Sequence, residues 1–271
     1  MIAQDKTAEA GPQSPFDELA ELYDRDFTET LLGRLHRDAV MRRLTARFKP
    51  GANVLELGCG TGEDAAILGR SGVRVLATDP SEAMVRVARR KVFLAGLSSM
   101  VTVEPLAAEA LQTSQLAQSG GPFDGAFSNF GALNCVADLK PVVVGLAHCV
   151  RPGGMALVCL MGPHCPWEWG WYVLRGRPSK AFRRLKPGGF PWRSTVIHYP
   201  SIRAVRHQFA PEFRLLRANA IGTLVPPPYA VAWAERRLAL VQRLSRIERR
   251  WETAWPLPWL ADHFLLEFER L

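Results

Sequence analysis

The chain has 271 residues, of which 48% are hydrophobic, and a formal net charge of +8. This length suits one large α/β domain with additions, or at most two small domains, and the apolar content is sufficient for a buried core. No apolar run approaches the ~20 residues of a membrane-spanning helix, and residues 1–15 lack the apolar segment of a signal peptide, so we expect a soluble, cytoplasmic protein.

The cysteines are spread along the chain without any C-x-x-C pair. There are five, at Cys59, Cys135, Cys149, Cys159 and Cys165. An odd count without metal-ligand spacing predicts reduced thiols, and it predicts no metal site.

The N-terminal 48 residues divide into two parts. Residues 1–15 are small, polar and interrupted by proline, which predicts a mobile tail. Apolar residues then recur at helical spacing, so we expect a helical cap over 16–48. Within this cap Tyr23 is a candidate for the lining of a ligand pocket, with an ordinary core tyrosine as the alternative.

Residues 54–79 carry the most informative pattern. An apolar strand leads into the turn G-C-G-T-G at 58–62, and helical spacing begins at Glu63. A second strand over 73–78 ends in Asp79. Glycines permit the backbone angles of a tight turn and the approach of a ligand to the main chain, and an acid at the tip of the second strand suits ribose hydroxyls. This β-α-β unit therefore predicts a nucleoside-binding site.

The spacing of the glycines bears on the kind of nucleoside. A dinucleotide site has the pattern G-x-G-x-x-G, with a pyrophosphate at the helix N-terminus. Here the third glycine comes one residue early, and the helix opens with Glu63 and Asp64, which would repel a pyrophosphate. A nucleoside cofactor without phosphate fits better. Glu56, just before the turn, adds a carboxylate that could hold an ammonium group or orient the loop.

Two motifs together indicate a family. E-L-G-C-G-T-G, ending at Gly62, and D-P-S-E-A-M, beginning at Asp79, resemble the class I S-adenosylmethionine-dependent methyltransferases. The resemblance covers about residues 45–161 well and implies a Rossmann-like, seven-stranded mixed sheet with its last strand antiparallel. It implies S-adenosyl-L-methionine as cofactor, with glycines around its methionine part and Asp79 on its ribose. The cofactor-binding residues expected in these motifs are Glu56, Gly58, Cys59, Gly60, Gly62, Asp79, Pro80 and Met84.

The next α/β unit departs from the family pattern. Ser81 predicts the N-cap of a helix to Leu94, and a third strand follows over 101–104. The family commonly has an acid after this strand that meets the adenine amino group, but this chain has Ala107 there. The main chain of Ala108 and the carboxylate of Glu109 are the expected substitutes.

A fourth strand over 123–128 ends in the loop N-F-G-A-L-N. Because ligands of open α/β sheets bind beyond the carboxyl ends of the strands, we expect Asn129 and Phe130 to face the transferred methyl group. A helix over 139–150 and the turn R-P-G-G then lead to a fully apolar fifth strand over 155–161, which predicts burial on both faces.

Residues 162–200 predict an insertion that covers the mouth of the site, which we call the lid. It contains Trp167, Trp169, Trp171 and Tyr172, and no acid occurs between Glu168 and Glu212. Nine cations fall in that interval: Arg175, Arg177, Lys180, Arg183, Arg184, Lys186, Arg193, Arg203 and Arg206. The aromatic residues suit a flat or apolar acceptor, and the cations suit an anionic acceptor or surface, with a solvated face as the alternative.

The C-terminal part completes a single domain over 16–271. Ser201 predicts the start of a helix to Phe209, and a sixth strand is expected over 213–224. Residues 226–260 predict a second insertion, with one amphipathic helix over 229–251. A seventh strand over 263–269 is expected to pair with the sixth as the antiparallel strand.

Methyl transfer from a sulfonium needs alignment and exclusion of water, and it needs a base only when the acceptor must lose a proton. His164 and His198, at the two ends of the lid, are the candidate bases, with surface or structural histidines as the alternative. Arg183 and Arg184 are candidates for binding an acceptor carboxylate or phosphate.

These features predict a methyltransferase acting on an O, N or S atom of a small, partly apolar metabolite, which is its expected partner, with neutral and anionic acceptors both left open. The sequence leaves the oligomeric state open. One alternative is an RNA or membrane-surface methyltransferase, since basic and aromatic residues suit both surfaces. The loop S-N-F-G-A-L-N argues against nucleic acid, because it lacks an N-P-P-Y type motif. The other alternative is a protein that binds S-adenosylmethionine without catalysis.

Overall fold

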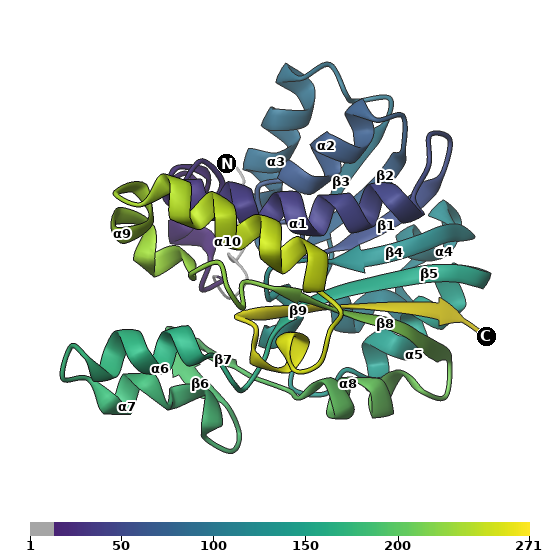
Figure 1. Cartoon of the computed structure of the whole chain (residues 1–271). Helices are drawn as coiled ribbons and strands as arrows, with labels where there is room; N and C mark the ends of the chain where they lie inside the picture. The colour runs from purple at the N-terminus through teal and green to yellow at the C-terminus, as the bar shows by residue number, and fades with distance from the viewer. Residues whose placement is uncertain (1–13) are drawn as a thin grey trace, which may run out of the picture.

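The computed structural model describes residues 14–271, so most of the tail predicted over 1–15 lies outside the described residues. A central seven-stranded sheet runs through the molecule, with helices on both faces (Figure 1). The strands lie in the order β3-β2-β1-β4-β5-β9-β8. Their bounds are β1 Asn53–Leu57, β2 Arg74–Asp79, β3 Val101–Pro105, β4 Phe123–Ser128, β5 Val150–Met161, β8 Phe213–Ile221 and β9 His263–Arg270.

The sheet confirms the predicted fold class. Strands β1 to β5 are parallel, whereas β9 is antiparallel to both β5 and β8. Strand β1 lies between β2 and β4, so the loops that follow these three strands emerge at one edge of the sheet. Gly58, Asp79 and Asn129 stand at that edge because each comes at or directly after the end of its strand.

Helices pack on the two faces of the sheet and create two hydrophobic cores. Helices α1, α2 and α3 cover one face, where Leu44, Ala65 and Val85 belong to one buried cluster. Helices α5 and α8 cover the other, where Leu146 and Phe209 belong to a second cluster. The bounds are α1 Leu31–Arg47, α2 Glu63–Arg70, α3 Glu82–Leu94, α4 Gln115–Gly120, α5 Lys140–Cys149 and α8 Ile202–Phe209.

The predicted helical cap is only partly a regular helix. Within 16–48, α1 is the α-helix, and it begins after Thr30, whose side chain accepts a hydrogen bond from the Gly33 amide. Before it lie a 3-10 turn over Asp17–Leu19 and a π-helical turn over Asp24–Thr28. Helical spacing did not distinguish these turns from a regular helix. Tertiary contacts hold the turns, and the spacing does not report such contacts.

Side chains fasten the segment 14–30 onto the β-α-β unit. The Ser81 hydroxyl donates to Asp17 at 2.5 Å, and the Thr61 hydroxyl donates to Asp24 at 2.6 Å. Lys91 on α3 adds an ion pair with Asp24 at 2.7 Å. The segment is therefore held across the carboxyl ends of β1 and β2.

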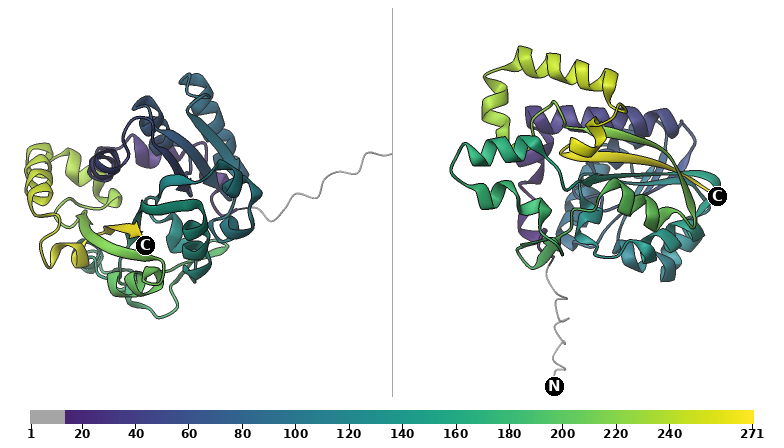
Figure 2. Two further views of the ribbon diagram at one scale, coloured as in Figure 1. Left: turned by 90° about the vertical axis from the view of Figure 1, so that its right-hand side faces the viewer. Right: turned by 60° about the horizontal axis from the view of Figure 1, so that its bottom comes forward.

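The lid, residues 162–200, folds as two short helices and a hairpin, and Figure 2 shows it beside the C-terminal insertion. Its elements are α6 Pro166–Val173, α7 Pro178–Ala181, β6 Phe190–Trp192 and β7 Thr195–Ile197. Aromatic contacts join it to the second insertion: the Trp167 and Trp233 ring centroids are 5.7 Å apart, and those of Trp171 and Tyr229 are 5.6 Å apart.

Two expectations for the C-terminal part were wrong in detail. Strand β8 ends at Ile221, three residues earlier than expected. The single helix expected over 229–251 is two helices, α9 Val231–Glu235 and α10 Leu238–Trp251. On α10, Leu240, Ile247 and Trp251 are exposed, because the buried side of this helix is narrow.

That narrow side of α10 carries a buried carboxylate. Glu248 accepts hydrogen bonds from the amides of Gly222, Leu224 and Val225 at 2.8, 2.6 and 3.1 Å. Glu248 thus satisfies the main-chain amides that follow the end of β8 and thereby holds the helix in place. The apolar periodicity had predicted a hydrophobic face on this helix.

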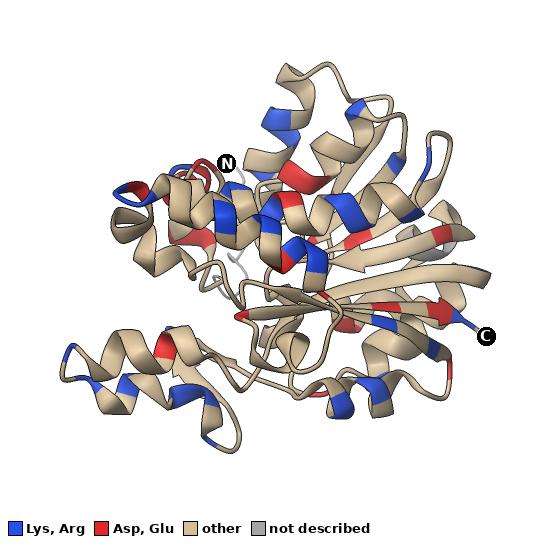
Figure 3. Cartoon of the chain, viewed as in Figure 1, with Lys and Arg blue, Asp and Glu red and all other residues tan. Residues whose placement is uncertain are grey.

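Positive charge is distributed over several surface elements. Lys and Arg residues lie along α7, α8 and α10 (Figure 3). Within the lid, some cations lie over aromatic rings, as Arg175 does over Trp171 at 3.6 Å. Over the described residues, no helix is both long and apolar enough to cross a membrane.

Candidate functional site

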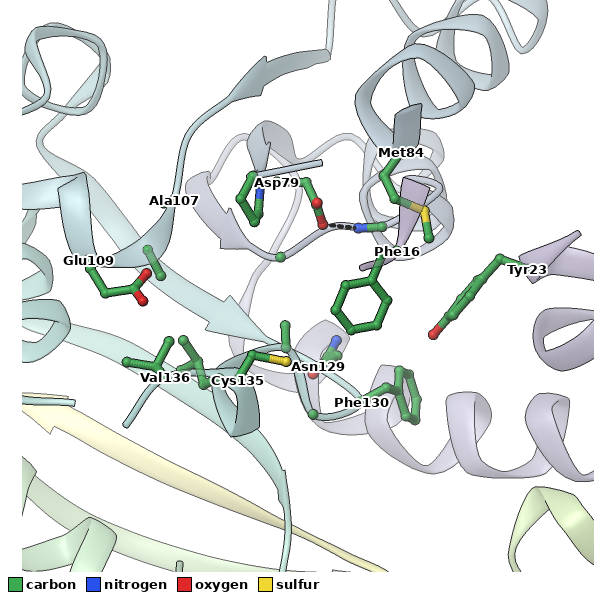
Figure 4. A pocket seen from close by; sticks show the side chains of 17 residues that line it. Phe16, Tyr23, Asp79, Met84, Ala107, Glu109, Asn129, Phe130, Cys135 and Val136 are labelled. Atoms are coloured by element: carbon green, nitrogen blue, oxygen red, sulfur yellow. Dashed lines mark hydrogen bonds between the residues drawn. The ribbon is translucent and has the colours of Figure 1, made fainter. Parts of the chain in front are cut away.

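A cavity of about 240 Å³ opens at the carboxyl ends of β1, β2 and β4 (Figure 4). We call it the first cavity. Ten of the thirteen residues predicted for cofactor binding line it: Tyr23, Gly58, Gly60, Asp79, Pro80, Met84, Ala108, Glu109, Asn129 and Phe130. The remaining lining residues are Phe16, Ala107, Gly131, Ala132, Leu133, Cys135 and Val136.

Asp79 is fixed at the centre of this cavity by main-chain donors. One carboxylate oxygen accepts from the Gly60 amide at 2.8 Å and the other from the Ser81 amide at 2.9 Å. Burial raises the pKa of Asp79, while these two hydrogen bonds oppose the rise. The carboxylate retains lone pairs for a hydroxyl donor.

The glycines of the turn have different roles. Gly58, Gly60 and Gly62 all have positive φ, at 68°, 53° and 74°. A Cβ on Gly58 would lie 2.2 Å from the Ala132 side chain, and one on Gly62 would lie 2.9 Å from Ala88. A Cβ on Gly60 would meet no protein atom within 4 Å. Gly62 therefore serves packing against α3, whereas Gly60 leaves open space beside the cavity.

Beneath the turn, a buried polar network holds Asn129. Asp64 pairs with Arg37 and accepts from the Asn129 amide at 2.8 Å. Burial and the nearby Asp64 raise the pKa of Glu56 well above its ordinary value. Glu56 Oε2 and Asn129 Oδ1 are both buried acceptors without a hydrogen-bond partner.

The three remaining predicted residues lie outside the lining. Glu56 and Cys59 are buried behind the turn, and Gly62 faces α3. Burial also raises the pKa of the Cys59 thiol well above its ordinary value. These residues therefore support the turn from behind.

The cavity has two chemically different ends, which Figure 4 shows at opposite sides of Asp79. At one end, Ala107 and Glu109 face Cys135 and Val136. At the other end, Tyr23 and Phe130 form the wall. Leu133 and Val136 were not predicted, since apolar loop residues give no sequence signal that distinguishes a ligand wall from ordinary core.

A second cavity, of about 290 Å³, lies behind that wall. Tyr23 and Phe130 line both cavities, so the two are neighbours. The other lining residues of the second cavity are Phe27, Met161, Arg183, Arg184, Pro227, Pro228, Tyr229, Asp262 and His263. Its lining thus comes from the N-terminal segment, the lid, the second insertion and the start of β9.

The arginines of the second cavity are already paired. Glu168, fully buried on α6, accepts from Arg183 at 2.6 Å and from Arg184 at 2.8 Å. Arg184 also donates to Asp262 at 2.5 Å. Two guanidinium groups therefore face two carboxylates, and no unpaired positive charge from this quartet remains to attract an anion.

The predicted bases do not line either cavity. His164 is exposed, and its ring packs against Trp169 at 6.2 Å. The main chain of His198 is held by Asn134: the His198 amide donates a hydrogen bond to the Asn134 carbonyl oxygen at 2.7 Å. The chain instead brings His263 and the Tyr229 hydroxyl to the second cavity, and that hydroxyl is buried without a partner.

Comparison with known proteins shows what this chain is similar to. Residues 54–154 match the family model described as "Methyltransferase domain". The demethylmenaquinone methyltransferase of Clavibacter sepedonicus is 35% identical over 163 residues, which cover 59% of this chain and 62% of that protein. Residues 54–154 thus carry a methyltransferase domain, and the chain is similar to class I S-adenosylmethionine-dependent methyltransferases.

A second relative has a different printed activity. The ubiquinone biosynthesis O-methyltransferase of Rhizobium rhizogenes is 32% identical over 114 residues, covering 42% of this chain and 43% of that protein. The chain thus spans less than two thirds of the length of these relatives.

Solved structures agree with the methyltransferase fold. The cyclase SpnF superposes with a TM-score of 0.62 at 16% identity, over 96% of both chains. The geranyl diphosphate C-methyltransferase of Streptomyces coelicolor A3(2) superposes with a TM-score of 0.57 at 12% identity, over 97% of this chain and 86% of that chain. At these identities the likeness shows the fold alone.

The first cavity fits S-adenosylmethionine, the cofactor of this family. Asp79 suits ribose hydroxyls, and the open space at Gly60 admits a ligand to the main chain. The unpartnered acceptor Asn129 Oδ1, on a residue that lines the cavity, suits the cofactor's ammonium group. The apolar end with Val136 suits a flat base.

Proposed function

We propose that this protein transfers the methyl group of S-adenosylmethionine to a neutral, flat, partly apolar small molecule bound in the second cavity. The favoured acceptor is a ring hydroxyl of the phenol or quinol type. The observation that carries the proposal is the wall shared by the two cavities, formed by Tyr23 and Phe130. Methyl transfer requires the methyl carbon of the donor and the accepting atom to lie close together and in line.

The lining of the second cavity supports a neutral ring. Phe27, Phe130, Met161 and the two prolines offer flat apolar surface. The anionic acceptor considered from the sequence loses support, because Arg183 and Arg184 are paired with Glu168 and Asp262. Two relatives are named as a demethylmenaquinone methyltransferase and a ubiquinone biosynthesis O-methyltransferase, which is consistent with a ring acceptor.

The bound cofactor would supply an activated methyl group. The acceptor oxygen would form a bond to the methyl carbon as the carbon–sulfur bond breaks, and the hydroxyl proton would be released. In this proposal Asp79 and Asn129 orient the donor, while Tyr23 and Phe130 align the acceptor and exclude water. Burial raises the pKa of Tyr23 to about 12, so its hydroxyl stays protonated as a hydrogen-bond donor.

The first arm of the test is cofactor binding by calorimetry. We expect Asp79→Ala to weaken binding of S-adenosylmethionine and S-adenosylhomocysteine roughly 10- to 100-fold, because charge-assisted hydrogen bonds to the ribose are lost. Asp124→Ala is the matched control, since Asp124 lies on β4 and does not line the first cavity. Equal binding by wild type and Asp79→Ala would contradict the assignment of the first cavity.

The second arm follows methyl transfer from labelled cofactor to a panel of phenols, quinols, amines, thiols and their anionic analogues. We expect turnover with neutral ring hydroxyls and a raised acceptor KM in Tyr229→Phe, with cofactor affinity unchanged. Tyr172→Phe is the control, because Tyr172 contacts the Tyr229 ring without lining the second cavity. Tight cofactor binding without turnover on the whole panel would favour the non-catalytic alternative.

A further inference from the structure

Three buried side chains meet at the inner side of the second cavity. His36 comes from α1, and Asp262 and His263 come from the start of β9. One nitrogen or oxygen atom from each lies within 4.8 Å of the other two. Their fractional exposures are 1%, 2% and 6%, so bulk water does not satisfy them.

Three nitrogen atoms of this cluster lack well-aligned hydrogen-bond partners. Neither ring nitrogen of His36 makes a well-aligned hydrogen bond, and the Val225 backbone is a polar neighbour of that ring. Nδ1 of His263 lies 3.0 Å from a carboxylate oxygen of Asp262 without the alignment of a hydrogen bond. Leaving a buried polar group unsatisfied costs about 1–3 kcal/mol, so three such atoms in one place require an explanation.

The carboxylate of this cluster has one oxygen turned toward the histidines. Arg184 occupies Oδ1 of Asp262, while Oδ2 is the oxygen that faces His263.

We propose that His36, Asp262 and His263 form a binding site for a divalent transition-metal ion, with an open coordination position toward the second cavity. Two imidazole nitrogens and one carboxylate oxygen are a donor set suited to Zn²⁺, Fe²⁺ or Mn²⁺, whereas Ca²⁺ and Mg²⁺ prefer oxygen alone. Asp262 and His263 line the cavity, so the remaining position is open to an oxygen of a bound molecule.

Arg184 has the role of a supporting residue in this site. It fixes the orientation of the Asp262 carboxylate in the way that partners of metal ligands commonly do. The charges of Arg183, Arg184, Glu168 and Asp262 cancel before an ion enters. A divalent ion would therefore favour an anionic oxygen, such as a deprotonated ring hydroxyl or hydroxide, as its fourth ligand.

A hydrogen-bonded His263–Asp262 pair without metal is the competing explanation, and it leaves His36 without a well-aligned hydrogen bond. The site rests on side-chain geometry and not on the proposed acceptor. Metal uptake is measured without cofactor or acceptor, so failure of the site and failure of the proposed function are separate results.

The experiment measures Zn²⁺ binding to the full chain after removal of metals with a chelator, by calorimetry and by metal analysis of the dialysed protein. We expect one ion per chain in the wild type and in the control His207→Gln, whose ring is exposed on α8. We expect His36→Gln and His263→Gln to bind at least about tenfold more weakly.

Absence of stoichiometric Zn²⁺ in the wild type would overturn the site. It would also be overturned if both variants, shown to be folded by circular dichroism, bound Zn²⁺ as tightly as the wild type. If the variants do not fold, Co²⁺ bound to the wild type decides the matter. An intense visible absorption from a low-coordinate, imidazole-ligated ion supports the site, and the weak spectrum of hydrated Co²⁺ overturns it.

Discussion

At the scale of single residues, Gly60 offers the sharpest test of the first cavity. Its Cβ position is open, but it lies beside the space assigned to the cofactor, and its φ is 53°. We expect Gly60→Ala to weaken S-adenosylhomocysteine binding about tenfold or more, because the methyl group enters that space while the backbone is strained. Calorimetry of the purified variant measures the loss.

Gly153→Ala is the matched control for backbone strain. Gly153 also has a positive φ, at 74°, and no atom within 4 Å of a built Cβ, but it lies in the exposed first part of β5, away from the first cavity. Both variants should lose similar stability, and Gly60→Ala alone should lose affinity. Equal affinity in the two variants would show that the space at Gly60 is unused.

Single residues were predictable from sequence where a local motif carries them. Asp79 and Gly60 stand in such motifs, and the structure places both in the first cavity. Phe16, Leu133 and Val136 lack a motif and become cavity walls only through tertiary packing. His36 could not be linked to Asp262, because residues so distant in sequence show no metal-ligand spacing.

At the scale of elements, Glu267 joins α1 to β9. This fully buried carboxylate accepts from Arg43 at 2.7 Å, from Arg47 at 2.8 Å and from Asn219 at 3.0 Å. We expect Glu267→Gln to reduce the free energy of unfolding by about 2 kcal/mol, measured by urea denaturation. Glu269→Gln, which removes the exposed pair with Arg214, should change it by at most about 0.5 kcal/mol.

The same pair of variants should respond differently to pH. Burial opposes ionisation of Glu267, but hydrogen bonds from Arg47 and Arg43 lower its pKa below the ordinary value. A group whose pKa is lower in the folded state stabilises above its unfolded pKa, and that stabilisation is lost as the pH falls through the folded pKa. The deficit of Glu267→Gln should therefore be full near pH 7 and shrink below about pH 4.

Regular elements followed from sequence where periodicity and capping agree. Strand β4 and helix α8 have the expected bounds, and Ser201 caps α8 through the Ala204 amide. Over 229–251 periodicity alone was available, and the break between α9 and α10 was not visible in it.

At the scale of the whole molecule, the N-terminal segment and the lid meet over the first cavity. Phe16 lines that cavity, and its ring centroid lies 5.1 Å from that of Trp192 in the hairpin of the lid. Arg193 adds an ion pair with Glu18 at 2.5 Å. Segments 175 residues apart in the sequence thus cover one ligand space, and no local sequence pattern could reveal that contact.

This arrangement predicts slow dissociation of S-adenosylhomocysteine, the product formed from the cofactor. We expect Trp192→Ala to speed dissociation of S-adenosylhomocysteine by up to about tenfold in stopped-flow displacement, because the aromatic contact that holds Phe16 is lost. Trp255→Ala is the control, since that side chain is 80% exposed. Identical dissociation rates in the two variants would show that the lid does not retain the cofactor.

Phe130 holds a φ of 50°, an uncommon backbone angle for a bulky residue, between the rings of Phe27 and His263. Because its ring belongs to both cavities, any ligand that settles its position alters the affinity of the other cavity. Linkage makes that influence reciprocal: the factor by which donor tightens acceptor binding equals the factor by which acceptor tightens donor binding. Under the proposed function, this one strained residue would couple the binding of donor and acceptor before any bond changes.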